Sequence, residues 1–340
     1  MAETKKASVK IDKRIEMLGI CLRLSDYHDK FYHLVTDLKN YPYLEEVNKY
    51  FSKFKNHKAI KLLNEVIEKL SFSYDAPVQL MLFVDDEWNF HGQNEYPFAN
   101  RLKKSKLVLD FLKELKAMAR ESNFEEFFQQ HKDYYQQEID SFNSCFDLDE
   151  VISFMQKLKM KVDGKQFTVN LALLLTNGGY GYFNGDNIFC TMSKMGDKEG
   201  NVDNIWGYNS AGEKSVFLHE FSHSFVNPLT EKYWNEIDKP QLTKKERDVL
   251  AKNAYSDIFS IICEYVIRAI QLSFIRQHSK NLDWFFEMHV KQGYSKDILL
   301  AVADKLEEHM QDNKTFEENY IEIANEISKA IENKKENYGK

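Results

Sequence analysis

The chain has 340 residues, of which 29 % are charged and 14 % aromatic, and its formal net charge at pH 7 is −7. A chain of this length can form one large domain or two ordinary ones, and its composition is that of a globular protein, not a disordered one. The negative net charge argues against a nucleic-acid-binding protein. No run of 18 apolar residues is present, so we expect no membrane span.

The cysteines and the N-terminus give two further expectations. The four cysteines are far apart and form no CxxC pair, which predicts neither a disulfide framework nor a cysteine zinc site. The N-terminus is polar and basic and lacks the apolar stretch of a signal peptide. We therefore expect a cytoplasmic protein, or an exported one if a signal has been removed. The sequence carries no indication of the oligomeric state.

Residues 1–150 are predicted to form a mainly helical N-terminal region. Within it a short apolar run at residues 78–84 follows the turn-forming sequence Asp75-Ala76-Pro77 and predicts one buried strand. The other apolar positions recur at helical spacing. They predict helices over residues 11–39, 44–54, 59–70, 102–118, 124–139 and 147–158.

Residues 151–340 are predicted to form a second region with a small sheet. Residues 167–175 and 188–192 have the composition of strands, and the glycine-rich residues 177–187 between them predict a tight turn or hairpin. An edge strand at this place could pair its backbone with an extended peptide, or the segment could be an ordinary hairpin. C-terminal helices are predicted over residues 282–291, 298–310 and 316–331.

The sequence His219-Glu220-Phe221-Ser222-His223 is an HExxH motif on a helix predicted to run from residue 213 to residue 227, where Pro228 would end it. Histidines at i and i+4 lie one turn apart on one helix face, and both imidazoles can reach one zinc ion. Glu220 follows the first histidine and is placed as the general base for a zinc-activated water. The alternative is a pair of ordinary core histidines with Glu220 in an ion pair.

A catalytic zinc ion usually takes a third protein ligand. The HExxHxxGxxH pattern fails, since Val226 and Leu229 occupy its last two defined positions. Glu264 is the best candidate, because it lies in an apolar helix predicted to continue from the Thr243/Glu246 capping box to about residue 277, and a buried carboxylate needs a partner.

Arg268 and Asp257, on the same predicted helix, are expected to support the site without binding the metal themselves. Arg268, at i+4 from Glu264, could form an ion pair with it, which is the alternative to metal ligation. If Glu264 binds the metal, we expect Arg268 to contact its carboxylate without binding the ion. Asp257 is expected to hold an imidazole N–H. Glu231 is the other carboxylate, besides Asp257, that could serve as the third ligand in place of Glu264.

With these residues the sequence resembles the gluzincin class of zinc metallopeptidases, and more closely a bacterial family of zincin-like proteins known mainly as a domain of unknown function. The resemblance rests on the segments HEFSHSFVNPL and CEYVIRAI and extends from about Ile11 to the C-terminal helices. It implies His219, His223 and Glu264 as zinc ligands, Glu220 as base and proton shuttle, and a zincin-like core. The 41 residues between His223 and Glu264 exceed the separation in many gluzincins.

We therefore expect a mainly helical α+β protein with a small mixed sheet, acting as a zinc-dependent peptidase on a peptide or protein substrate. The oxyanion of the reaction needs a donor, and Tyr294 is preferred over His289, Tyr265 and Arg268 because it lies at a helix start. Three alternatives stay open: a zinc-binding module without catalysis, a helical interaction protein with an accidental motif, and a zinc hydrolase acting on a non-peptide substrate.

Overall fold

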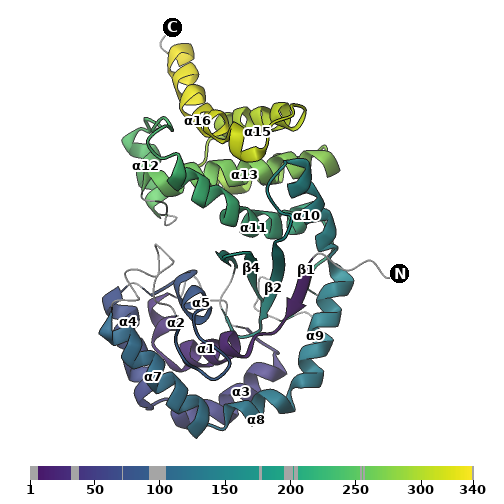
Figure 1. The fold of residues 1–340 in the computed structure, drawn as a ribbon. Coiled ribbons are helices and arrows are strands. Elements are labelled where there is room, and N and C mark those ends of the chain that lie inside the picture. Colours follow the sequence, from purple (N-terminus) through teal and green to yellow (C-terminus); the bar gives the residue numbers. More distant parts are fainter. Residues whose placement is uncertain are drawn as a thin grey trace.

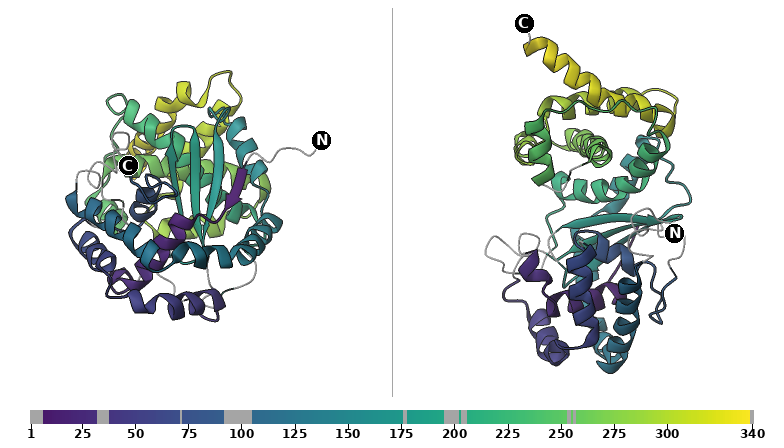
Figure 2. Two further views of the ribbon diagram at one scale, coloured as in Figure 1. Left: turned by 60° about the horizontal axis from the view of Figure 1, so that its bottom comes forward. Right: turned by 90° about the vertical axis from the view of Figure 1, so that its left-hand side faces the viewer.

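A computed structural model describes residues 7–31, 38–70, 72–91, 105–175, 178–194, 202, 206–252, 255 and 257–338. A small sheet lies between two layers of helices (Figures 1 and 2). The fold is thus α+β and mainly helical, with a small mixed sheet.

The N-terminal helices are α1 (Lys13–Leu24), α2 (Tyr27–Lys30), α3 (Pro42–Phe51), the 3-10 helix η2 (Ser52–Phe54), α4 (Lys58–Leu70), α5 (Ala76–Met81), α7 (Lys106–Glu121), α8 (Phe124–Gln130) and α9 (Lys132–Cys145). The later helices are α10 (Leu148–Lys157), α11 (Ala211–Lys232), α12 (Lys244–Lys252), α13 (Ile258–His278), α14 (Asp283–Lys291), α15 (Lys296–Met310) and α16 (Phe316–Tyr338).

The sheet contains β1 (Ala7–Lys10), β2 (Gln166–Ala172), β3 (Gly179–Asn184) and β4 (Asn187–Ser193) in the order β1-β2-β4-β3. β1 pairs with β2 and β2 with β4 in parallel, whereas β3 is antiparallel to β4 and forms one edge. Because β1 comes from the N-terminal region and the other strands do not, both predicted regions share the sheet. The boundary near residue 150 stays a prediction.

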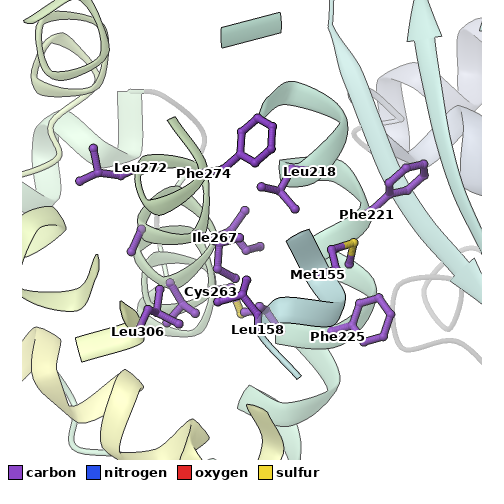
Figure 3. Packing of buried hydrophobic residues seen from close by; sticks show 14 of the residues in the cluster. Met155, Leu158, Leu218, Phe221, Phe225, Cys263, Ile267, Leu272, Phe274 and Leu306 are labelled. Atoms are coloured by element: carbon purple, nitrogen blue, oxygen red, sulfur yellow. The ribbon is translucent and has the colours of Figure 1, made fainter. Parts of the chain in front are cut away.

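The two faces of the sheet bury two separate hydrophobic cores. Side chains alternate along a strand, so Val169 and Leu171 of β2 face the core of the later helices, while Tyr180 and Tyr182 of β3 face the N-terminal helices. On the later side α11 packs against the sheet through Phe221, whose ring centroid lies 5.0 Å from that of Phe167. Figure 3 shows side chains of α10, α11, α13 and α15 meeting in this core.

α13 is the central helix of the later layer. It is long and apolar enough to cross a membrane by length and composition alone, but 83 % of its most apolar 18-residue window is buried inside the protein. α11 and α15 pack against it, and α16 lies against α15 (Figure 1). The burial explains its composition, since a helix covered on all sides is apolar all round.

The strand predicted at residues 78–84 is wrong. Residues 76–81 form helix α5, with Pro77 in its first turn, and of the predicted strand only Val84 forms a β-bridge, with Phe90. Proline is favoured in the first turn of a helix, where its missing N–H is not needed. Apart from Gln79 the buried helix is apolar, and a short run of that kind has no periodicity that separates it from a strand.

Two helix boundaries also differ from the prediction. α11 continues through Pro228 to Lys232, because Thr230 is fully buried and its hydroxyl bonds to the Val226 carbonyl at 3.0 Å, so tertiary packing holds the last turn. The long helix predicted up to residue 277 is divided into α12 and α13, and Asp257 is the N-cap of α13. The start of the helix predicted from residue 102, residue 177 of the glycine cluster, and residues 253, 254 and 256 lie outside the described residues.

Candidate metal centre

α11 brings the two histidines of the motif onto one face. The helix starts with a capping box, in which Ser210 and Glu213 each accept a hydrogen bond from the other's backbone N–H. His219 and His223 follow two to three turns later, and their Nε2 atoms lie 3.2 Å apart. Both rings are partly exposed to the cleft described below.

Glu264 on α13 completes a group of three possible metal ligands. Its carboxylate oxygens lie 3.7 Å from His219 Nε2 and 3.6 Å from His223 Nε2, and all the ligand atoms of the three residues lie within 4.8 Å of one another. Two atoms bound to one zinc ion at 2.0–2.1 Å and at the tetrahedral angle are about 3.3–3.4 Å apart. The three side chains are therefore of the right type, and close enough together, to hold one metal ion between them.

The outer nitrogens of the two imidazoles have partners that orient the rings. His219 Nδ1 lies 3.0 Å from Gln271 Oε1, and His223 Nδ1 lies 3.3 Å from Asn227 Oδ1. An N–H at Nδ1 donating to these oxygens leaves the Nε2 lone pair directed at the centre. The prediction for Asp257 is wrong: its carboxylate accepts hydrogen bonds from the Ser260 N–H and hydroxyl and caps α13.

The two residues whose amide oxygens accept these hydrogen bonds have a recognisable position in the sequence. Asn227 is one turn beyond His223, and Gln271 is two turns beyond Glu264, within an otherwise apolar helix. Gln271 is held in turn, because its amide group donates to the Ser215 carbonyl at 3.0 Å. The signal in the sequence is an amide side chain at i+4 from His223 and another at i+7 from Glu264.

Burial keeps the two imidazoles neutral. It lowers the pKa of His219 well below its ordinary value, helped by the charges of His223 and Arg268, and it lowers the pKa of His223 to about 4. Neutral imidazole is the form that binds a metal ion. The histidines therefore require no deprotonation before metal binding at neutral pH.

Glu220 lies beneath the edge strand β3. Its side chain is 9 % exposed and accepts a hydrogen bond from the Gly181 N–H. Burial raises the pKa of Glu220 to about 7, and Asp75 adds to the shift, while the Gly181 bond and Arg268 oppose it. Glu220 lines the same cleft as both histidines, and among the described residues it forms no ion pair.

Two glycines allow β3 to pass this close to α11. A Cβ at Gly181 would lie 1.9 Å from the Glu220 carbonyl oxygen, and a Cβ at Gly179 would lie 2.9 Å from Cγ of the Glu220 side chain. The glycine cluster thus forms a strand as well as a turn, and its glycines are needed where strand and helix touch. The glycine-rich sequence predicts the turn, but it does not predict that β3 and α11 lie so close together.

Arg268 forms the predicted ion pair with Glu264 and anchors it from behind. Its guanidinium also donates to His289 Nδ1 at 3.2 Å and to the Tyr255 hydroxyl at 3.3 Å, and it lies 4.2 Å above the ring centroid of Tyr294. Arg268 is therefore part of a buried network that fixes the direction of the Glu264 carboxylate.

Tyr294 does not lie where an oxyanion donor is needed. It is 2 % exposed, packs against Tyr265 with ring centroids 5.0 Å apart, and does not line the cleft. His289, Tyr265 and Arg268 do not line the cleft either. Tyr255, which lies next to Tyr294 and Arg268, does line the cleft, and its hydroxyl accepts a hydrogen bond from Arg268.

A cleft of about 820 Å³ contains this centre. It is bounded by α11 and α13, by the edge strand β3, and by Tyr74, Asp75 and Gln79 at the start of α5. The N-terminal region thus supplies one wall and the later helices the floor. A cavity of this size can bind several residues of a chain-like ligand.

Comparison with known proteins gives one match. No curated protein and no solved structure shows significant similarity to the chain. One family model matches residues 7–325, which is nearly the whole sequence and includes every residue of the centre. The chain therefore belongs to the family described as "Domain of unknown function (DUF4932)".

Proposed function

We propose that this protein is a zinc-dependent metallohydrolase of the gluzincin type that cleaves peptide bonds. The observation that carries the proposal is the spacing of His219, His223 and Glu264, which matches one tetrahedral ion, with Glu220 beside it in the same cleft. A purely structural zinc site would close the fourth position with a side chain and would have no use for this carboxylate.

Zinc held by His219, His223 and Glu264 would polarise the substrate carbonyl and make water at the site a better nucleophile. Glu220 accepts the proton of the attacking water and then delivers it to the leaving amine. The Gly181 N–H holds the Glu220 carboxylate in one orientation during this transfer. Tyr255 replaces Tyr294 as the candidate donor to the oxyanion, because this residue lines the cleft and its hydroxyl accepts a hydrogen bond from Arg268, which leaves the hydroxyl proton available to donate.

The free edge of β3 favours a peptide as substrate. The register with β4 makes Gly179, Gly181 and Phe183 the residues whose backbone groups point away from β4, and all three line the cleft. An extended peptide can pair with such an edge through its main chain. An ester or amide that has no peptide main chain could not form this strand pairing.

Metal content tests the first half of the proposal. Elemental analysis of the wild type should give about one zinc per chain, and His223→Ala and Glu264→Ala should lose it. The control His57→Ala, a histidine paired with Glu121 in the N-terminal region, should keep the metal. If the wild type takes up no zinc after loading, the HExxH motif is accidental, and the alternative of a helical interaction module is supported instead.

Activity tests the second half. The zinc-loaded wild type should cleave members of a peptide library, and Glu220→Gln should keep its zinc but lose cleavage by a factor of about 100 or more. Full hydrolytic activity in Glu220→Gln would contradict the mechanism. A zinc-loaded wild type that cleaves no peptide would contradict the peptidase assignment while leaving the metal site intact.

A further inference from the structure

The cleft is lined by acidic side chains. Among the described residues that line it there are four carboxylates, Asp75, Glu220, Glu231 and Glu264, and no lysine or arginine. Three of these carboxylates are already engaged: Glu264 with Arg268, Glu220 with Gly181, and Asp75 with the Gln79 amide. The carboxylate of Glu231 makes no hydrogen bond or ion pair with any of the described residues, although its backbone carbonyl accepts the Trp234 N–H at 3.3 Å.

We propose that Glu231, with Trp234 and Phe259, forms a subsite for a lysine or arginine side chain of the substrate. The identification of the ligand as a peptide rests on the proposed function. On this proposal the cleft selects peptides that carry a basic side chain, and Glu231 is the residue that selects them.

The position of Glu231 follows from helix geometry. His219, His223, Asn227 and Glu231 are spaced four residues apart and form one stripe along α11, and all four line the cleft. Glu231 lies eight residues beyond His223, which is about 12 Å along the helix axis. An extended peptide covers that distance with about four residues. At physiological ionic strength 12 Å exceeds the screening length of about 8 Å, so the charge of Glu231 acts separately from that of the metal centre.

The helix end strengthens the negative potential at this place. Glu231 is in the last turn of α11, where the helix dipole places a partial negative charge. A carboxylate is unfavourable for the helix at this end, so it does not stabilise the fold and is available for another role. The neighbouring Lys232 does not neutralise it, because Lys232 Nζ pairs with Glu317 at 2.6 Å.

Aromatic side chains form the wall next to this carboxylate. The ring centroids of Trp234 and Phe259 are 5.8 Å apart, and both rings, with Pro228, line the cleft. Lys239 lies over the Trp234 ring at 4.0 Å and holds it in place, but Lys239 does not line the cleft. Lysine and arginine pack their aliphatic stems on such a wall while their charged ends reach a carboxylate.

Binding of matched peptides to zinc-loaded Glu220→Gln protein tests the subsite without catalysis. One series of alanine hexapeptides carries a single lysine at each position in turn, and a second series carries uncharged norleucine at the same positions. By calorimetry, lysine at one position should bind about ten-fold more tightly than norleucine, as a hydrogen bond to a charged group contributes. Adding Glu231→Gln should reduce this ratio to near one, whereas adding Glu236→Gln, an exposed glutamate outside the cleft, should leave it unchanged.

The outcomes separate this inference from the proposed function. Equal binding of the two series, a lysine preference that survives Glu231→Gln, or no binding of any peptide would overturn the subsite. A preference that depends on Glu231, in a protein whose zinc-loaded wild type cleaves none of the peptides, would establish the subsite and refute the peptidase. Cleavage of both series at equal rates would refute the subsite alone.

Discussion

Glu16 offers a direct test of how this fold tolerates a buried acid. It lies on α1, is 1 % exposed, and accepts hydrogen bonds from the Leu173 N–H at 3.0 Å and the Tyr43 hydroxyl at 2.9 Å. Burial raises the pKa of Glu16 from its ordinary 4.5 to about 7, although both hydrogen bonds act against the shift. The carboxyl group is therefore protonated in the folded protein at pH values where it is ionised in the unfolded chain.

The sign of the pH effect follows from this difference. Between about pH 4.5 and pH 7 the folded state binds more protons at Glu16 than the unfolded state, so the free energy of unfolding falls as the pH rises. The contribution is fully present below pH 4.5 and lost above about pH 7. At 1.36 kcal/mol for each pKa unit the total is about 3 kcal/mol.

Replacing Glu16 by glutamine keeps the shape and removes the titration. Urea denaturation of Glu16→Gln at pH 8 should give a free energy of unfolding about 3 kcal/mol above that of the wild type, and at pH 4.5 the two should be nearly equal. The contrasting variant is Glu138→Gln, which should destabilise at both pH values by about 3 kcal/mol, because it leaves the buried Lys194 without its 2.8 Å partner. A Glu16→Gln protein less stable than the wild type at pH 8 would refute the reasoning.

Two further predictions concern the centre. Gly181→Ala should lower the free energy of unfolding by about 3 kcal/mol or more in the same urea assay, because its Cβ meets the Glu220 carbonyl. Gly185→Ala, with nothing within 4 Å of its Cβ, should cost only the 1–2 kcal/mol of its positive φ, and an equal effect of the two would contradict this account. Gln271→Leu should weaken zinc binding about 10- to 100-fold in competition with a chelator, since it frees His219 Nδ1, whereas the exposed Gln277→Leu on the same helix should not.

Local patterns in the sequence predicted those parts of the fold that local physics determines. The capping box at Thr243 is present, with the Glu246 N–H bonded to the threonine hydroxyl at 3.2 Å, and the apolar periodicities of the C-terminal segment correspond to α14, α15 and α16. The predictions are wrong where contacts with distant parts of the chain determine the structure. A mostly apolar run such as residues 78–84 can form either a buried strand or a buried helix, and here it forms helix α5. α11 continues through Pro228 because Thr230 packs in the core and the Tyr320 hydroxyl donates to the Val226 carbonyl at 3.3 Å.

The site shows the same division. The i, i+4 spacing of His219 and His223 is a property of one helix and could be derived from the sequence. Tyr255 lies between α12 and α13, and its place at the cleft depends on tertiary packing that no local pattern indicates. The place of Tyr294 at a helix start predicts a donor to the oxyanion. The structure places it beneath Arg268, because the short turn after α14 folds back onto α13 and the Tyr265 hydroxyl accepts the Ser295 N–H at 3.0 Å.

Glu264 shows why two interpretations of one residue need not compete. The sequence offers either an ion pair with Arg268 or ligation of a metal, because both satisfy a buried carboxylate. In the structure Arg268 Nη1 lies against Oε2 of Glu264, while Oε1 lies 3.6 Å from His223 Nε2. A carboxylate has lone pairs for both partners. The ion pair with the arginine is therefore compatible with the proposed metal ligation: Arg268 would hold the carboxylate through Oε2 and leave Oε1 for the ion.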